Sequence, residues 1–150
     1  MDWWNAQRII AQKSTQYHCA ACGIHKNKIK DHDWLEAHEY VNVDHPNCVC
    51  EFINVVPLCY YCHKFIHVGL LHLNFKLKTI SKKEVVEILE HGFKILADSK
   101  LQCNPEQFEV AKHFKNLNTL GVTPYSVKPS EKLNPFDWKL LMDNNFYTWK

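Results

Sequence analysis

Apolar positions near the start of the chain recur with the spacing of a helix. Within residues 3–16, four apolar side chains fall near one face: Trp3, Ala6, Ile10 and Ala11. A repeat of about 3.6 residues is typical of an amphipathic helix. The segment is therefore predicted to be a helix that packs through this face.

Two short runs further along the chain favour strands instead. Residues 34–39 and 52–56 are predicted to be strands, and the second run is rich in β-branched and aromatic side chains. Pro57 is expected to end the second strand, and a helix is expected to begin near Tyr60. Short strands followed by a helix predict an α+β fold for this part of the chain.

The pattern beyond Tyr60 is mainly helical. Ser81-Lys82-Lys83-Glu84 matches a capping box, in which serine and the glutamate three residues later close the first turn of a helix. Apolar side chains follow it at helical spacing: Val85, Val86, Ile88, Leu89, Phe93 and Leu96. A long amphipathic helix is therefore expected after Ser81.

Two further helices are expected towards the C-terminus. Asn104-Pro105 supplies an N-cap and a first-turn proline, and Gly121 can end the helix that follows. Its apolar positions are Phe108, Ala111, Phe114 and Leu117. Residues 121–134 are expected to form a loop, after which Asn134-Pro135 repeats the capping signal. The last predicted element is a short helix with Trp138, Leu141 and Met142.

Composition is consistent with one compact globular domain and does not by itself decide the partner. The 150 residues are 46% hydrophobic and 13% aromatic, so a core can be buried. No run of about 18 apolar residues and no signal-peptide layout is present, so a soluble cytoplasmic protein without membrane contact is expected. The net charge is only +2, whereas strong nucleic-acid binders usually carry a clear basic excess.

Cysteine and histidine are the residue types that change this picture. The chain has seven cysteines and ten histidines, and an odd cysteine count without a secretory signal does not predict a disulfide framework. Four of the cysteines form two Cys-x-x-Cys pairs: Cys19, Cys22, Cys59 and Cys62. A two-residue gap lets one tight turn present two thiolates to the same tetrahedral ion.

A structural zinc site is therefore predicted at these four cysteines. Gly23 directly follows the first pair, where such a turn often needs a left-handed backbone. Four sulfur ligands close the coordination shell, so the Zn²⁺ would contribute to folding rather than to chemistry. The alternatives are buried free cysteines or a redox pair. The remaining cysteines, Cys48, Cys50 and Cys103, are interpreted as free thiols.

A second cluster of residues lies between and just after these pairs. The order is Leu35-Glu36-Ala37-His38-Glu39, then Phe52 to Cys59 with Asn54, then Cys62-His63-Lys64-Phe65-Ile66-His67. His63 and His67 are four residues apart, so on a helix they face the same way and can hold one cation. His38 on a preceding strand would complete a three-sided site that keeps positions open for substrate and water.

This combination resembles the zinc-containing HNH endonucleases, which have a ββα-metal core. The resemblance covers about residues 17–69 and includes Asn54, nine positions before His63. It implies a core over residues 1–75, with the N-terminal helix, and a helical extension over 76–150. By the same resemblance His38, His63 and His67 are ligands of a catalytic metal. Asn54 holds the loop between the strands through hydrogen bonds and orients the general base.

The reaction implied by the resemblance is metal-dependent hydrolysis of DNA that leaves a 5′ phosphate. The catalytic cation would be Mg²⁺ or another divalent metal such as Mn²⁺, Ni²⁺ or Zn²⁺. Its part would be to contact the scissile phosphate and stabilise charge on the leaving 3′ oxygen. Free-standing nucleases of this kind occur in bacteria and phages, which places the expected site of action in a bacterial or phage-infected cell.

The sequence departs from the family pattern at the general base. Most members have histidine at the position that Glu39 occupies directly after His38. The segment can be aligned with the family motif in two registers. In the first register Glu39 is the general base; in the second His38 is the general base and Glu39 binds metal or orients another group. Adjacent strand residues point to opposite faces, so both residues can serve the site only where the strand is irregular. The first register is slightly favoured, and loss of activity is a third alternative. Asp44 and His45 are interpreted as turn residues.

Several lysines are candidates for contacts with DNA phosphates. Lys64 lies on the expected central helix, and Lys76 and Lys78 follow it. Further candidates are Lys26, Lys28, Lys30, Lys82 and Lys83, and any one of them can equally be an ordinary solvated side chain. Tyr60 and Tyr61 would stack on bases or belong to the core. The C-terminal helices could bind a second copy or a protein partner.

The main competing interpretation is a zinc-stapled module that binds nucleic acid or protein without cutting it. Under this interpretation the site is degenerate at Glu39, where the family base is missing. A more distant alternative is a redox or metal-sensing protein that uses the spare cysteines. Cleavage of plasmid DNA in the presence of divalent metal separates an endonuclease from both.

Overall fold

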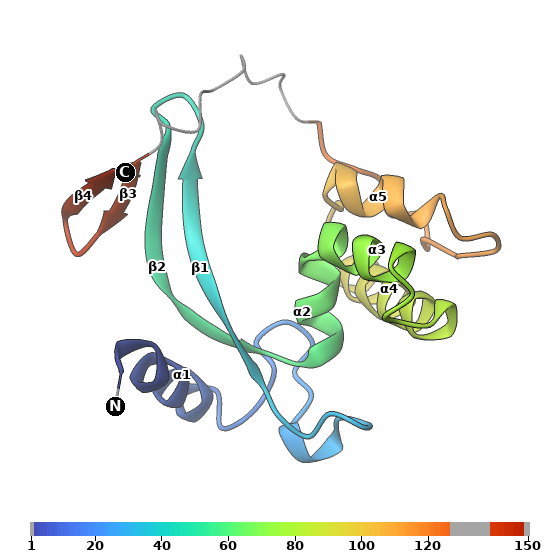
Figure 1. The fold of residues 1–150 in the computed structure, drawn as a ribbon, viewed down its shortest axis with the longest axis horizontal. Coiled ribbons are helices and arrows are strands. Elements are labelled where there is room, and N and C mark those ends of the chain that lie inside the picture. Colours follow the sequence, from blue (N-terminus) through green and yellow to red (C-terminus); the bar gives the residue numbers. More distant parts are fainter. Residues whose placement is uncertain (1, 127–138, 149–150) are drawn as a thin grey trace.

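A computed structural model of the chain describes residues 2–126 and 139–148. Within these residues the fold is α+β, and four strands form one sheet in the order β1-β2-β3-β4. Figure 1 shows a long, curved β1–β2 hairpin. Helix α1 lies at one end of it, β3 and β4 lie beside its tip, and the remaining helices gather on its other side (Figure 1). The α+β prediction is confirmed.

The hairpin consists of β1 (Glu36–Asp44) and β2 (Val49–Leu58), which pair antiparallel. Both strands are longer than the predicted 34–39 and 52–56, and β1 carries a register shift between Tyr40 and Val41. Pro57 does not end β2. Its carbonyl points away from β1 and accepts a hydrogen bond from the Ala20 amide at 2.8 Å. Because the N–H and C=O of one strand residue point to the same side, the N–H that proline lacks would also point away from β1. Pro57 therefore removes no hydrogen bond between the two strands.

Helix α1 (Trp3–Ser14) begins at Asp2, whose side chain accepts a hydrogen bond from the Asn5 amide. It is slightly shorter than predicted because Gln16 adopts a positive φ of 51°. Of the four expected core positions only Ala11 is buried, while Trp3 and Ile10 stay exposed. Gln12 donates a hydrogen bond to the Leu35 carbonyl at 3.0 Å, which ties α1 to the segment before β1.

Two short helices follow the hairpin, α2 (Tyr60–Ile66) and α3 (Val68–Lys76). The predicted start at Tyr60 is confirmed, and the Cys59 side chain caps α2. The break between the helices falls at His67, whose backbone has φ −90° and ψ 47°. The His67 amide still donates to the His63 carbonyl at 3.1 Å, so these two residues keep the spacing of one helical turn.

Helices α4 (Lys82–Asp98) and α5 (Pro105–Ala111) begin at the predicted caps, Ser81 and Asn104. The expected helix through Leu117 is wrong beyond Ala111, because the chain there continues in turns with three-residue hydrogen bonds. Those turns still bury Phe114. The apolar spacing therefore predicted the buried position of Phe114 correctly, but the continuous helix that it also predicted is absent beyond Ala111.

The predicted last helix is also wrong for its described part. Leu141 and Met142 lie in β3 (Lys139–Met142), which pairs in parallel with β2 and antiparallel with β4 (Asn145–Thr148). Asn134, Pro135 and Trp138 lie outside the described residues. Asp143 and Asn144 have positive φ angles of 51° and 62°, as a tight two-residue hairpin turn requires. The extension over 76–150 is therefore not helical throughout.

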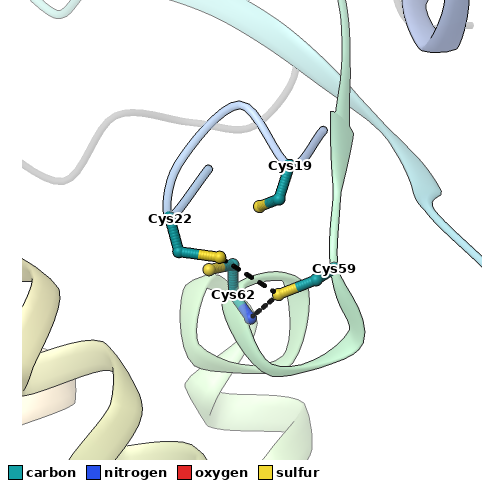
Figure 2. Close-up of side chains that lie close together, drawn as sticks. All are labelled: Cys19, Cys22, Cys59 and Cys62. Carbon is teal, nitrogen blue, oxygen red and sulfur yellow. Dashed lines mark hydrogen bonds between the residues drawn. The ribbon is translucent and has the colours of Figure 1, made fainter. Parts of the chain in front are cut away.

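A small apolar cluster surrounds the two Cys-x-x-Cys pairs where β2 meets α2 (Figure 2). Its buried members are Cys19, Ile29, Leu35, Leu58, Cys59 and Cys62. Three of these six are metal-type cysteines, so few purely apolar side chains hold this end of the hairpin. The stability of this cluster therefore depends on the interaction that holds the cysteine sulfurs together.

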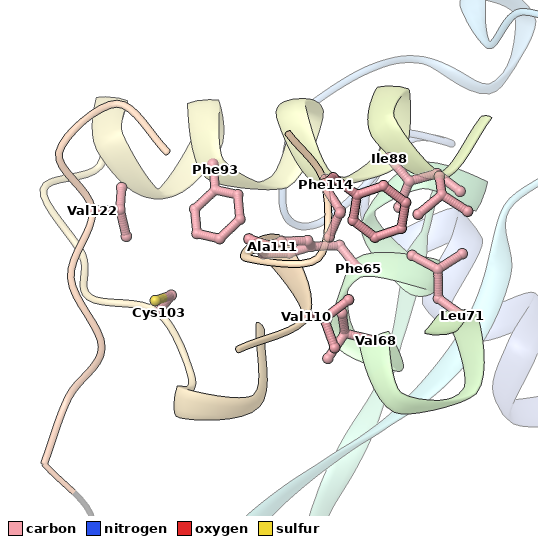
Figure 3. Packing of buried hydrophobic residues seen from close by; sticks show 12 residues of the cluster. Phe65, Val68, Leu71, Ile88, Phe93, Cys103, Val110, Ala111, Phe114 and Val122 are labelled. Carbon is pink, nitrogen blue, oxygen red and sulfur yellow. The ribbon is translucent and has the colours of Figure 1, made fainter. Parts of the chain in front are cut away.

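A larger, separate core joins α2 to α5 (Figure 3). The Phe65 and Phe93 rings contact edge to face, with centroids 5.3 Å apart. The buried members are Phe65, Val68, Leu71, Val85, Ile88, Leu89, Phe93, Cys103, Val110, Ala111, Phe114 and Val122. Helices α2 to α5 therefore pack on one another through a cluster of buried side chains that is larger than the one around the cysteines.

We predict that Gly92→Ala destabilises the protein. Gly92 of α4 faces the Phe65 ring so closely that an added Cβ would overlap it. Overpacking of this kind costs about 1–3 kcal/mol, against the ~1 kcal/mol by which alanine favours a helix over glycine. We therefore expect a lower free energy of unfolding in urea.

The matched control is Glu90→Ala, an exposed position on the same helix. Its free energy of unfolding should change by no more than about 0.5 kcal/mol. An equal or higher stability of Gly92→Ala would show that α2 and α4 do not pack this closely.

Candidate metal centres

Four cysteines from three parts of the chain meet at one point (Figure 2). Cys19 and Cys22 lie on the loop after α1, Cys59 lies between β2 and α2 as the N-cap of α2, and Cys62 lies in the first turn of α2. All four sulfur atoms lie within 4.8 Å of one another, and the Cys22 and Cys59 sulfurs are 3.7 Å apart. Four close sulfur ligands can hold a zinc ion.

The loop that carries Cys19 and Cys22 is shaped by its backbone. Gly23 has a φ of +76°, the left-handed conformation expected for it, and its amide donates to the Cys19 carbonyl at 2.9 Å. The Cys19 amide in turn donates to the Ile24 carbonyl at 2.8 Å. These backbone hydrogen bonds hold residues 19–24 in a tight turn, the knuckle, without any contribution from a bound ion.

The pKa values of the four thiols diverge because their sulfurs are so close. Hydrogen bonds from Cys19 and then Cys59 lower the pKa of the Cys22 thiol well below its usual range. Cys19 and Cys22 raise the pKa of the Cys62 thiol far above it, and burial adds to the effect. Negative charges this close together repel one another, so four thiolates can share the site only around a cation. That is the electrostatic demand of a metal site.

His91 of α4 also contacts this cluster. Its Nε2 lies 3.3 Å from the Cys62 sulfur, and its ring lies 5.5 Å from the Tyr61 ring between centroids. The sequence analysis did not identify His91, because nothing in its local pattern distinguishes it from a surface histidine. The contact connects the long helix α4 to the cysteine cluster.

A second cluster brings together the three predicted imidazoles. His38 comes from β1, His63 from α2, and His67 from the junction of α2 and α3. One nitrogen from each lies within 4.8 Å of the others. Ring centroids are 5.3 Å apart for His38 and His63, and 4.8 Å apart for His63 and His67. The predicted convergence of these three side chains is present.

Glu36 joins the imidazole cluster, although the sequence analysis gave it no role. Its carboxylate contacts Nδ1 of His63, which leaves the other ring nitrogen for the cluster. The contact with His63 is the main reason that the pKa of Glu36 lies below its ordinary value, against the opposing effect of burial. Carboxylates commonly hold metal-binding imidazoles in this way, fixing tautomer and orientation. The sequence contains one signal for this role: Glu36 lies two residues before His38, so on a strand the two side chains point to the same face.

His67 is suited to bind a cation in its neutral form. Burial, followed by the nearby His63 and His38, lowers the pKa of His67 below its ordinary value. At neutral pH His67 therefore keeps a lone pair, which a metal ligand requires.

Glu39 and Asn54 lie beside this cluster rather than within it. The pairing of β1 with β2 is regular from Glu36 to Tyr40, so strand alternation places the Cβ of Glu39 on the opposite face from His38. The strand irregularity comes only after Tyr40. Asn54, opposite Tyr40, shares the face of His38, but its side chain makes no hydrogen bond with another residue in the described ranges. The roles of Glu39 and Asn54 stay predictions.

The lysines proposed for phosphate contact differ in position. The Lys64 Nζ lies 5.5 Å from the centroid of the Tyr60 ring, one residue after His63. Lys76 ends α3, and Lys78 follows it; both are exposed. Of the other candidates, Lys26 lies over the Tyr17 ring, and the exposed ones are Lys28, Lys30, Lys82 and Lys83.

Other predicted features have ordinary surroundings. Asp44 is the last residue of β1 and not a turn residue, but it accepts two hydrogen bonds from Asn47 in the hairpin turn, and His45 lies in that turn as predicted. Tyr60 and Tyr61 are partly buried against the helical core, and the Tyr60 hydroxyl donates to Glu84 at 2.6 Å. None of the seven cysteines forms a disulfide, and both metal-type clusters exclude Cys48, Cys50 and Cys103.

Comparisons with protein-family models, with curated proteins and with solved structures found no match. The resemblance to HNH endonucleases therefore rests on the residue pattern of the sequence alone. Among the helices of the described ranges, none has the length and apolar character that crossing a membrane requires.

We predict that removing the zinc ligands unfolds the knuckle end of the molecule. Cys62→Ser should lower the zinc content below one ion per chain, because a four-sulfur site depends on every ligand. A loss of several kcal/mol corresponds to a drop in Tm of about 10 °C or more for a chain of this size. Metal analysis and thermal unfolding measure both effects.

The control is Cys50→Ser, the same substitution outside both clusters. It should leave the zinc content unchanged. Equal zinc content in Cys62→Ser and the parent protein would contradict a four-cysteine site.

A second prediction concerns Glu36. Glu36→Gln keeps the size of the side chain but removes the charge that orients His63, so the affinity of the imidazole cluster for Ni²⁺ should fall about 10- to 100-fold. Calorimetric titration of the zinc-loaded protein measures this affinity. Glu51→Gln on β2 is the control and should bind Ni²⁺ as the parent does; equal affinities in all three proteins would exclude Glu36 from the site.

Proposed function

We propose that the protein is a metal-dependent endonuclease that hydrolyses phosphodiester bonds of DNA. The observation that carries this proposal is the convergence of His38, His63 and His67 beside a separate four-cysteine cluster. Two metal-type clusters with different ligand chemistry suggest two tasks, one structural and one chemical. The resemblance of the residue pattern to HNH endonucleases supports the same assignment.

The two clusters differ in the property that separates structural from catalytic metal sites. Four sulfurs complete a tetrahedral shell, whereas three imidazoles leave at least one position for water or substrate. The His63 and Glu36 side chains keep 22% and 23% of their surface exposed, so a phosphate can approach them. Cys19, Cys59 and Cys62 are buried.

The donor chemistry narrows the choice of catalytic metal. Imidazole nitrogens suit Zn²⁺ and Ni²⁺, whereas Mg²⁺ prefers oxygen ligands and retains its water. Mn²⁺ and Mg²⁺ remain in the proposal as metals to be tested. When bound, the metal supplies a positive charge that polarises the phosphate and stabilises the leaving oxygen.

The reaction is hydrolysis with water as the nucleophile. The water oxygen forms a bond to phosphorus, the bond from phosphorus to the 3′ oxygen breaks, and the products are a 5′ phosphate and a 3′ hydroxyl. Glu36 holds the His63 ring in place, and Lys64 is positioned to attract the phosphate backbone. Lys76 and Lys78 extend this positive charge beyond α3.

Glu39 and His38 are the two candidates for the general base that accepts the proton of the attacking water. The place of His38 among the imidazoles supports the register in which it binds metal and Glu39 is the base. The alternation of β1 opposes that register, because it directs Glu39 to the other face. This same observation favours the second candidate function, a zinc-stapled module that binds DNA or protein without cutting.

We predict that the zinc-loaded protein nicks plasmid DNA when Ni²⁺, Mn²⁺, Mg²⁺ or additional Zn²⁺ is supplied. His63→Ala should reduce the rate by about 10²-fold or more, because the charge that stabilises the transition state is lost with its ligand. Agarose gels resolve the supercoiled, nicked and linear forms. Zinc content at the cysteines should be unchanged in the variant.

The matched control is His113→Ala, an exposed histidine outside both clusters, which should nick at the parent rate. Binding of plasmid without nicking under all four metals would instead select the binding module. Equal nicking by His63→Ala would attribute the activity to another site or to a contaminant.

A further inference from the structure

Three aromatic rings form a continuous array next to the imidazole cluster. His32 stacks on Tyr60 with ring centroids 3.8 Å apart and planes within 14° of parallel. On its other side His32 meets Trp34 edge to face at 5.2 Å. Trp34 is 48% exposed, so one end of the array faces solvent. Neither the fold nor the proposed chemistry uses this exposed ring.

The array is held rigidly, although little of its contact is polar. The buried Nδ1 of His32 has no hydrogen-bond partner in the described part of the chain, so ring contacts determine its place. The Tyr60 hydroxyl is anchored to Glu84 of α4. Rigid aromatic side chains lose little conformational entropy on binding, which favours them as contact surfaces.

The array lies directly beside the imidazole cluster. Trp34 is two residues before Glu36 in the chain, and after His63 its side chain is one of the groups that lower the pKa of the Glu36 carboxyl. Glu36 in turn contacts His63. Lys64 lies near the Tyr60 ring at the opposite end of the array. A nucleotide whose phosphate reached the imidazoles would therefore have aromatic rings and a positive charge within reach of its base and backbone.

We propose that Trp34, supported by His32 and Tyr60, is a stacking platform for an unpaired base next to the scissile phosphate. This inference rests on the proposed function, and it assigns the substrate class: DNA with unpaired nucleotides, such as single strands or bulges. Stacking of a base on an aromatic side chain tolerates every sequence. A base in an intact duplex must first leave its stack, which opposes binding there.

The test measures the binding of labelled oligonucleotides to zinc-loaded protein without further divalent metal. The probes are a single strand, the matching duplex, and that duplex with a bulge. Trp34→Leu should weaken binding of the single strand and the bulge about 5- to 150-fold and change duplex binding little. Trp34→Phe, which retains a ring, should restore most of the affinity.

Trp4→Leu is the matched control, because Trp4 is an exposed tryptophan on α1 outside the array. It should bind all three probes as the parent does. Zinc content and circular dichroism should confirm that Trp34→Leu is folded. Equal losses for duplex and single strand, or no loss at all, would overturn the stacking platform.

The outcome separates this inference from the proposed function. Trp34-dependent binding of unpaired strands without cleavage under any metal would retain the platform and reject the endonuclease. Metal-dependent nicking with unchanged binding by Trp34→Leu would retain the endonuclease and reject the platform.

Discussion

The interaction on which the rest of the structure depends is the meeting of four cysteine sulfurs at the junction of β2 and α2. Cys59 and Cys62 enclose the first turn of α2, and His63 follows directly, so whatever fixes these sulfurs also fixes the first imidazole on the helix. The knuckle adds a second constraint through the bond from the Ala20 amide to the Pro57 carbonyl. Because few apolar side chains pack at this end of the molecule, the link between the sulfurs takes the place of a larger hydrophobic core.

The imidazole cluster lies where this stapled end meets the helical core. β1 supplies His38 and Glu36, and its pairing with β2 places both on one face towards α2. Phe65, between His63 and His67, anchors the same helix in the larger core. The contacts of His91 with Cys62 and of Tyr60 with Glu84 join α4 to this region. Residues of the cysteine cluster and of the imidazole cluster therefore share helix α2 but face different neighbours.

Sequence reasoning predicted features that depend on local spacing, and it missed those that depend on tertiary contacts. The two Cys-x-x-Cys turns, the caps at Ser81 and Asn104 and the spacing of His63 and His67 are encoded within a few residues. The roles of Glu36 and His91 arise from segments far apart in sequence, so no local pattern indicates them. The β3–β4 hairpin differs from the predicted helix because the apolar run Leu140, Leu141 and Met142 is too short to show a period.

We expect two ions to bind in two chemically distinct places, and anomalous X-ray diffraction from one crystal locates both. Data collected at the zinc edge, and again after a Ni²⁺ soak at an energy between the nickel and zinc edges, locate each metal separately. We expect a zinc peak among the sulfurs of Cys19, Cys22, Cys59 and Cys62, and a nickel peak among His38, His63 and His67. A crystal with metal at the sulfurs and imidazoles that bind neither ion would contradict the catalytic assignment and leave only a stapled scaffold.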